Sequence, residues 1–335
     1  CQTQRHKDAS HDGRVAGEVD VRHDVILSSM PESGMTKPRL HVGVMGAGAV
    51  GCYFGGMLAR AGHDVTLIAR PEHVEAILRD GLHMDTKTFD EHVRVRASSD
   101  PAALEGAQLV LFCVKSGDTE SAGHQIKSYV GKDTVILCLQ NGCDNDQRLR
   151  GVLAQPEVAA AVVFLGSEMR APGVVKHHGS GELVIDPIRA IPGLAEIFQA
   201  AAIPARVSDN VRGELWRKLI INCAYNAISA LARKRYGQIV PSPGVRDVMR
   251  DIIEECLSVA TAEGINVPGD VEAAVWRIVE TIPQQYSSTA QDIMRGKPTE
   301  IDYLNGHIVR RGKALGIRTP ANQVLWAMVK LIEAK

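Results

Sequence analysis

The feature that most restricts the fold of this 335-residue chain is a glycine-rich turn between two apolar runs. The runs are residues 42–45 and 65–68, and they are separated by about one helix length. Strand, glycine turn, helix and strand in this order are typical of a dinucleotide-binding βαβ unit. The first glycine makes the tight turn, the second lets backbone N–H groups approach a pyrophosphate, and the third lets helix and strand pack closely. The predicted cofactor-binding residues are Gly46, Ala47, Gly48, Ala49, Val50 and Gly51.

The remaining pattern changes character along the chain. Up to residue 139, β-branched runs alternate with amphipathic stretches; the first stretch carries the helical stripe Val50, Phe54, Met57, Leu58 and Ala61, with Gly62 as its end. Residues 158–186 predict shorter strands with Gly and Pro turns, added antiparallel at a sheet edge. Long helical patterns follow Asn210, and Thr319-Pro320 opens the last helix.

These patterns predict an α/β fold, with a doubly wound Rossmann-type sheet followed by an all-helical domain. We expect residues 1–37 to be a disordered tail, because large apolar residues are few there. The cofactor-binding domain would span residues 38–208. The helical domain, for substrate binding and dimerisation, would span residues 209–335, and its apolar faces leave room for a homodimer.

Composition excludes several classes of protein. Lys and Arg number 38 against 39 Asp and Glu, so no excess positive charge exists to neutralise nucleic acid or an anionic membrane. No uninterrupted apolar run approaches the roughly 18 residues of a spanning helix. The seven cysteines form no CxxC pair and predict reduced thiols in the cytoplasm. His177-His178 lacks further ligands at suitable spacing, so we expect an exposed turn between strands there and no metal site.

Arg70 stands where many NAD-binding chains carry a carboxylate for the ribose 2′-OH. It follows the second strand, 24 positions after Gly46 (70 − 46 = 24). A guanidinium can hold a 2′-phosphate that a carboxylate would repel, so Arg70 favours NADPH over NADH. The alternative is a solvated loop residue.

Polar residues also follow two later strands, where ligands of such sheets bind. Lys115 comes after one strand and Asn141 after the next. A surface lysine and an ordinary Asn-Gly turn explain these positions equally well.

A more informative polar group lies within residues 213–231. Lys218, Asn222 and Asn226 occur at i, i+4 and i+8 on a helix that is apolar in nearly every other direction. A helix of this kind is buried, which favours an internal, solvated cleft over a face in open water. Further on, Ser287-Ser288 precedes a helix, and residues 299–302 have the pattern of a capping box.

Together these residues resemble the ketopantoate reductase (2-dehydropantoate 2-reductase) family from about residue 40 to the end. The motifs that carry the resemblance are the turn at 46–51, Val114-Lys115, Gln140-Asn141-Gly142, the stretch 214–222 with Asn226, Gln291-Asp292-Ile293 and 299–302. The resemblance implies a helical domain akin to that of 6-phosphogluconate dehydrogenase. It also implies NADPH-dependent reduction of ketopantoate, a small 2-oxo acid, to pantoate in pantothenate synthesis.

The resemblance further implies roles for single residues. Lys218 would be the general acid, and Glu300 would position that lysine and the substrate. The substrate would be bound by Asn222, Asn226 and Ser288, while Lys115 and Asn141 would lie where nicotinamide and substrate meet. A lysine in a partly desolvated cleft suits the acid role, because its pKa can fall toward neutrality.

Two departures leave the substrate open. Tyr236 stands where some members have an asparagine, and Cys143-Asp144-Asn145 replaces smaller residues. The chain could therefore reduce another branched 2-oxo acid, or be a catalytically silent NADPH-binding sensor. A D-2-hydroxyacid dehydrogenase is disfavoured, since the only histidine beyond residue 178 is His307, which follows a glycine expected to break a helix.

Overall fold

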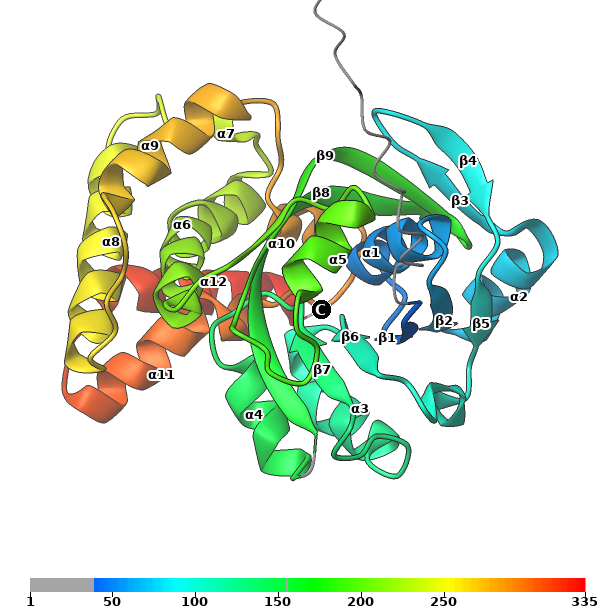
Figure 1. The fold of residues 1–335 in the computed structure, drawn as a ribbon. Coiled ribbons are helices and arrows are strands. Elements are labelled where there is room, and N and C mark those ends of the chain that lie inside the picture. The colour runs from blue at the N-terminus through cyan, green and yellow to red at the C-terminus, as the bar shows by residue number, and fades with distance from the viewer. Residues whose placement is uncertain (1–38, 155, 335) are drawn as a thin grey trace, which may run out of the picture. The chain divides into compact units, whose positions relative to one another are not determined.

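The computed structural model describes residues 39–154 and 156–334, and the predicted tail lies outside them. The chain from Pro38 onward forms one compact unit. Within it, a ten-stranded sheet with its flanking helices comes first, and a bundle of helices follows (Figure 1). This arrangement confirms the predicted fold class.

The centre of the sheet is parallel and has the Rossmann strand order. Six strands pair side by side in the order β5-β2-β1-β6-β7-β8, which corresponds to the order 3-2-1-4-5-6 of dinucleotide-binding folds. The first five are β5 (Arg96–Ser98), β2 (Asp64–Ile68), β1 (His41–Met45), β6 (Leu109–Phe112) and β7 (Val135–Cys138). Of these, β1, β2, β6 and β7 are almost entirely buried, as expected for strands covered on both faces, whereas the edge strand β5 is partly exposed.

A long hairpin continues the sheet, and here the prediction of short edge strands is wrong. β8 (Glu157–Ala171) and β9 (Val174–Ile185) pair antiparallel around the predicted Pro172-Gly173 turn. The sheet extends further through β3 (Leu82–Asp85) and β4 (Asp90–Val93), while β10 (Ala205–Val207) also pairs with β9. Gly179 and Gly181, which suggested a turn, instead lie at register shifts of the hairpin, because glycine in a strand commonly marks a bulge.

Helices cover both faces of the parallel strands. α1 (Ala49–Arg60) packs on one face through Phe54 and Leu58, which are fully buried, and it ends just before Gly62, whose φ is +92°. α3 and α4 lie together on the opposite face (Figure 1). The other helices of this half are α2 (Pro71–Asp80), α3 (Thr119–Ile126), α4 (Asn145–Val152) and α5 (Leu194–Ala200), with a 3₁₀ turn at Pro101–Leu104 and another at Ser116–Asp118.

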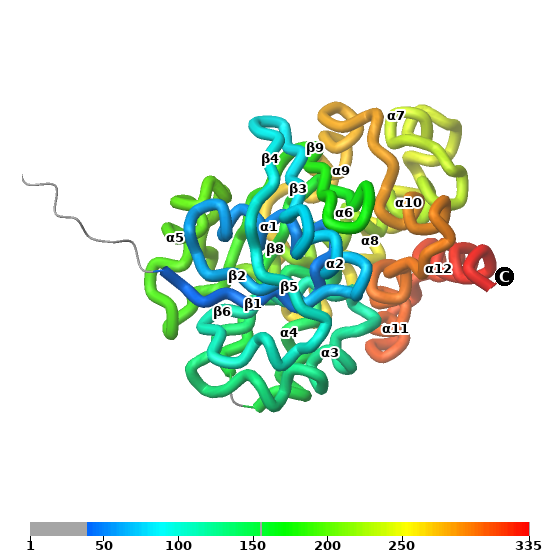
Figure 2. Tube along the Cα trace, turned by 90° about the vertical axis from the view of Figure 1, so that its right-hand side faces the viewer, coloured from blue at the N-terminus to red at the C-terminus, as the bar shows by residue number. Residues whose placement is uncertain are grey.

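The second half is built around α6 (Val211–Ala232), which begins at an N-cap where the Asn210 side chain accepts from the Gly213 N–H. Trp216 and Tyr225 of α6 are almost completely buried, as the all-round apolar pattern predicted. The last helix, α12, which is red in Figure 2, begins at Pro320 after Thr319, as expected. The remaining helices are α7 (Tyr236–Ile239), α8 (Val245–Ala262), α9 (Val271–Thr281), α10 (Ser288–Met294), α11 (Asn305–Leu315) and α12 (Pro320–Glu333), with a 3₁₀ turn at Ile301–Tyr303.

Candidate functional site

The glycine turn between β1 and α1 has the geometry that its sequence predicts. Gly46 has φ +96°, and its N–H and that of Ala47 donate to the Ile68 carbonyl at 3.2 and 2.9 Å, which ties the turn to the end of β2. A Cβ placed on Gly51 would lie 2.4 Å from the Gly46 oxygen. The first and third glycines are therefore required by the fold itself.

Gly48 is different, since a Cβ there would meet nothing within 4 Å and would point into open space. In the described part of the chain, no side chain caps the α1 N-terminus, where Ala49 and Val50 open the helix. The first N–H groups of a helix lack intrahelical partners and favour an anion. The turn thus fits the pyrophosphate of a dinucleotide.

Arg70 lies exposed just beyond β2, as the N-cap residue of α2. One turn along the helix, His73 Nδ1 accepts from the Gly173 N–H at 3.2 Å. Burial lowers the pKa of His73, and the charges of Arg70 and Lys297 lower it further, against an opposing contribution from Glu72. Arg70 and Lys297, which come from different halves of the chain, therefore both raise the positive potential near His73.

Lys218 of α6 points at the carboxyl edge of the parallel strands. Its Nζ donates to Asn141 Oδ1 at 3.0 Å and to the Val163 carbonyl of β8 at 2.6 Å. Burial lowers the pKa of Lys218 to about 8, while the negative charge of Glu300 works in the opposite direction. The lysine is thus a cation whose proton is easily given up near neutral pH.

Asn141 connects Lys218 to Glu300. Its Nδ2 donates to Glu300 Oε2 at 3.2 Å, while its Oδ1 accepts from Lys218. Glu300, only 8% exposed, also accepts at Oε1 from the Ser116 backbone N–H at 2.9 Å and the Ser116 hydroxyl at 3.0 Å. Lys115 Nζ lies 3.6 Å from Oε2. These five residues are called the lysine cluster below.

The predicted capping box at residues 299–302 does not form. Thr299 Oγ1 accepts from the Ile301 N–H, whereas the Asp302 carboxylate accepts from Trp326 Nε1 and Lys330 Nζ. The Thr299 N–H instead donates to Glu333 at 2.7 Å. The local pattern suggested a cap, but residues of α12 compete for the same polar groups.

Sequence reasoning assigned no role to two residues at this site, Ser116 and Asp292, although Asp292 lies in a motif of the family resemblance. Ser116 follows Lys115 directly and is fully buried. Asp292 of α10 forms an ion pair with Lys115 at 2.8 Å; burial raises its pKa, against the charge of Lys115. Asp292 is four residues after Ser288, a helical spacing that placed it beside a predicted substrate residue.

The other predicted polar residues lie further along α6. Asn226 Nδ2 donates to Ser288 Oγ at 3.4 Å, and Asn222 is half-buried on the turn between Lys218 and Asn226. Ser287 caps α10, and its hydroxyl also donates to the Asn226 carbonyl at 3.1 Å. The structure therefore brings α10 against the polar stripe of α6.

The two departures from the family pattern have separate surroundings. Tyr236 packs in the helical core with its ring centroid 4.6 Å from that of Tyr225. Cys143 is buried, with Sγ 3.3 Å from His307 Nε2, and Asp144 Oδ2 lies 3.5 Å from His307 Nδ1. His307 lies in the first turn of α11. The prediction that the glycine before it breaks a helix is therefore wrong.

Other sequence expectations have mixed outcomes. His177 and His178 lie within β9, where His178 contacts Glu168 at 3.0 Å, so the expected turn is wrong. Over residues 39–154 and 156–334, no group of three metal-ligating side chains comes together. None of the helices described here has the length and apolar character to cross a membrane. The six cysteines within the described ranges are free thiols, and five of them are buried.

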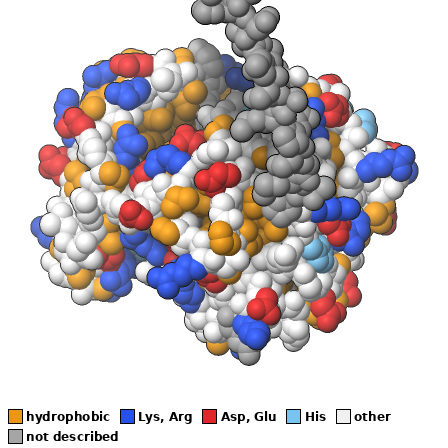
Figure 3. Space-filling view, in the orientation of Figure 1, with side chains coloured by type: hydrophobic (Ala, Val, Ile, Leu, Met, Phe, Trp, Pro, Cys, Tyr) orange, Lys and Arg blue, Asp and Glu red, His pale blue; other side chains and the backbone are white. Residues whose placement is uncertain are grey.

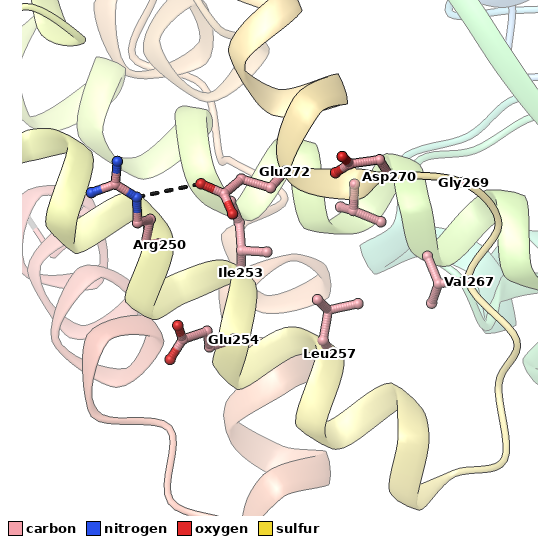
Figure 4. A pocket seen from close by; sticks show the side chains of 9 residues that line it. Arg250, Ile253, Glu254, Leu257, Val267, Gly269, Asp270 and Glu272 are labelled. Carbon is pink, nitrogen blue, oxygen red and sulfur yellow. Dashed lines mark hydrogen bonds and ion pairs between the residues drawn. The ribbon is translucent and has the colours of Figure 1, made fainter.

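The surface adds little to this site. Lys, Arg, Asp and Glu side chains are interspersed over the face drawn in Figure 3. A hollow between α8 and the segment leading into α9 is lined by Glu254 and Leu257, with Arg250 bonded to Glu272 at its rim (Figure 4). Since Arg250 is already paired with acidic residues, this hollow has no free cation for an anionic substrate.

Comparison with known proteins places the chain in one family. The family model described as ketopantoate reductase PanE/ApbA matches residues 42–190, and the model of its C-terminal part matches residues 210–333. The 2-dehydropantoate 2-reductase of Pyrococcus horikoshii is 32% identical over 298 residues, covering 87% of this chain and 97% of that protein.

Two solved structures are similar to this chain over most of its length. The PanE/ApbA family ketopantoate reductase from Ralstonia eutropha JMP134 is 60% identical with a TM-score of 0.86, covering 88% of this chain and 98% of that one. A D-mandelate dehydrogenase solved with NADH and anilino(oxo)acetate is 28% identical with a TM-score of 0.82, covering 88% and 98%.

Proposed function

The chain belongs to the ketopantoate reductase PanE/ApbA family of oxidoreductases, and we propose that it reduces 2-dehydropantoate to (R)-pantoate with NADPH. The observation that carries the proposal is the bonded series Lys218, Asn141, Glu300. It places a partly desolvated ammonium at the carboxyl edge of the sheet, the edge at which ligands of such folds bind. Pantoate formation would place the enzyme in pantothenate synthesis.

Lys218 is the general acid of the proposed reaction. When bound on the glycine turn, NADPH supplies the hydride. The substrate's keto oxygen then gains negative charge, and the Lys218 ammonium gives it a proton as that charge develops. Asn141 and the Val163 carbonyl hold the ammonium in place, and Glu300 fixes the Asn141 amide from the other side.

The hydroxyl and carboxylate of the substrate are held along α6 and α10. Asn222, Asn226 and Ser288 offer amide and hydroxyl groups at successive turns from Lys218. Lys115 and Asn141 lie where the nicotinamide and the substrate meet, and the positive charge of Lys115 is balanced by Asp292. The proposed substrate site and the proposed nicotinamide site thus share the carboxyl edge of β6 and β7.

The choice of NADPH rests on Arg70. Its exposed guanidinium at the end of β2 suits a ribose 2′-phosphate, and Lys297 adds positive charge nearby. The D-mandelate dehydrogenase structure contains NADH, so this fold also accepts NADH. The alternative for Arg70 is a solvated residue with no part in that choice.

The test is NADPH oxidation at 340 nm by the purified protein with 2-dehydropantoate, beside other branched 2-oxo acids and with NADH as control. We expect the largest kcat/KM for 2-dehydropantoate with NADPH. A larger value for another 2-oxo acid would show that the substrate has changed while the acid and the cofactor site remain.

A second candidate is reduction of a different 2-oxo acid. It is favoured by Tyr236, which lies in the helical core where some family members have an asparagine, and by the fold shared with D-mandelate dehydrogenase. Binding of NADPH with no turnover of any 2-oxo acid would instead support a catalytically silent sensor.

Three further proposals concern organisation. We divide the chain at residue 208, between β10 and α6, into a cofactor-binding domain and a helical domain. We expect a cytoplasmic enzyme whose partner is a small 2-oxo acid, with neither nucleic acid nor membrane involved. A homodimer through the helical domain is the matching assembly, and sedimentation of the purified protein tests it.

A further inference from the structure

Ser116 contacts both Glu300 and Asn141, and Asn141 in turn holds Lys218. It opens the 3₁₀ turn after β6, and no part of its side chain is exposed. Its backbone N–H and hydroxyl both lie within 3.0 Å of Glu300 Oε1, although Glu300 is 184 residues away in the chain. The same hydroxyl lies 2.8 Å from the Asn141 carbonyl.

The direction of the Ser116 hydroxyl proton follows from comparing its two possible acceptors. A serine hydroxyl has one proton, so it can donate to Glu300 or to the Asn141 carbonyl, but not fully to both. The Asn141 carbonyl already accepts from Asn145 Nδ2 at 2.6 Å. Glu300 Oε1 has no comparable side-chain donor among the described residues. A charged carboxylate is a stronger acceptor than a carbonyl that already has a donor, so we assign the hydroxyl proton to Glu300.

The orientation of Asn145 is fixed independently. Its Oδ1 accepts from the buried Thr119 hydroxyl at 2.9 Å and from Arg148 at 3.1 Å. The Nδ2 of the same amide must then face the Asn141 carbonyl. The Arg148 guanidinium can only donate, so its contact with Oδ1 determines this orientation of the Asn145 amide.

From these contacts we propose that Ser116 is a positioning residue, which orients the Glu300 carboxylate and, through Asn141, the Lys218 ammonium. This inference rests on the proposed function, since it assigns Ser116 a part in delivering the Lys218 proton. Ser116 itself lies behind Glu300 and acts through it. A purely structural serine would stabilise the fold without affecting the acid.

The test compares Ser116→Ala with the control Thr134→Val. Thr134 is also buried, and its hydroxyl donates to the Ala107 carbonyl at 3.0 Å, but it lies at the opposite end of β7 from Asn141. We expect Ser116→Ala to lower kcat about tenfold, with the dissociation constant of NADPH unchanged, because one charge-assisted hydrogen bond is lost. Thr134→Val should lower the melting temperature and leave kcat unchanged.

A second readout does not depend on turnover. The pH dependence of Lys218 modification by an amine-reactive anhydride, followed by mass spectrometry, gives the titration midpoint of that lysine. The charge of Glu300 raises this midpoint. In Ser116→Ala the carboxylate would be held less closely, so the Lys218 midpoint should fall by roughly half a pH unit. The midpoint in Thr134→Val should equal that of the unaltered protein.

The outcomes separate the two proposals. If the unaltered protein reduces no 2-oxo acid, the proposed function fails, and the Lys218 midpoint alone decides the role of Ser116. If Ser116→Ala does not fold, Ser116→Cys keeps a side chain of the same shape, with a slightly larger atom and a weaker donor, and should show the same changes at smaller size. An unchanged midpoint, with kcat equal to that of Thr134→Val, would overturn the role of Ser116.

Discussion

The sheet half and the helical half of this protein form their parts of the site in opposite ways. The glycine turn at 46–51 presents backbone N–H groups, and it leaves space for a ligand because Gly48 has no side chain and no side chain of the described residues caps α1. α6 presents the side chains of Lys218 and Asn226 from an otherwise buried helix. The glycine turn depends on a short stretch of chain. The position of the Lys218 side chain depends on partners far away in sequence, such as Asn141.

This difference gives separable consequences for mutation. A change in the turn should affect cofactor binding and leave the chemistry of the bound complex intact. A change at Lys218 should lower the rate of the chemical step and leave cofactor binding intact. The experiments below test whether the two halves separate in this way.

The largest effect is expected for Lys218→Ala. Loss of the general acid should lower turnover by roughly 10² to 10⁴-fold, while NADPH binding, followed by cofactor fluorescence, stays the same. Lys132→Ala removes an exposed lysine of the sheet half and serves as the control. Turnover equal to that of the control would remove Lys218 as the acid.

Arg70→Asp tests the cofactor side alone. A carboxylate in place of the guanidinium should weaken NADPH by roughly 10- to 100-fold and NADH much less, because only NADPH carries the 2′-phosphate. Isothermal titration with both cofactors measures this. The control Arg79→Asp changes an exposed charge on the same helix. Equal losses for the two cofactors would contradict the 2′-phosphate role.

The pH dependence of turnover should follow Lys218. The acid must carry its proton, and its pKa is lowered to about 8, so kcat/KM for reduction should be level below that pH and fall about tenfold per unit above it. Cofactor binding should stay level through the same range. A kcat/KM that does not change between pH 7 and roughly pH 10 would show that Lys218 is not the proton donor.

The smallest effect is expected for Gly48→Ala. Its added methyl group would point into open space, so thermal stability should be unchanged while NADPH affinity falls severalfold. Gly131→Ala is a matched control, because a Cβ there also meets nothing within 4 Å but lies away from the turn. A loss of stability in Gly48→Ala alone would show that the turn needs this glycine for folding.

The features that sequence reasoning predicted are the local ones. The order of β1, α1 and β2, the buried character of α6 and the start of α12 each follow from patterns shorter than about 25 residues. The long β8–β9 hairpin was missed, because the same glycines that mark a bulge in a strand are also typical of turns.

The lysine cluster could be predicted only in part. Family resemblance identified Lys218, Asn141 and Glu300, but the contacts among them join residues 77 and 159 positions apart. Nothing in the sequence next to Ser116 shows that its hydroxyl meets a carboxylate 184 residues later. Such pairs are set by packing of the two halves, which no local propensity encodes.

The regular spacing of Lys218, Asn222 and Asn226 sets the distances between these polar groups along α6. Positions 218, 222 and 226 rise by 1.5 Å per residue, so the first and last lie about 12 Å apart along the axis, with Asn222 midway. Under the proposed function, Asn222 would meet the substrate about 6 Å along the helix axis from the keto oxygen at Lys218. Asn226 already bonds to Ser288, so a substrate too short to reach this pair would leave their contact intact, whereas a longer one would have to replace it with bonds of its own.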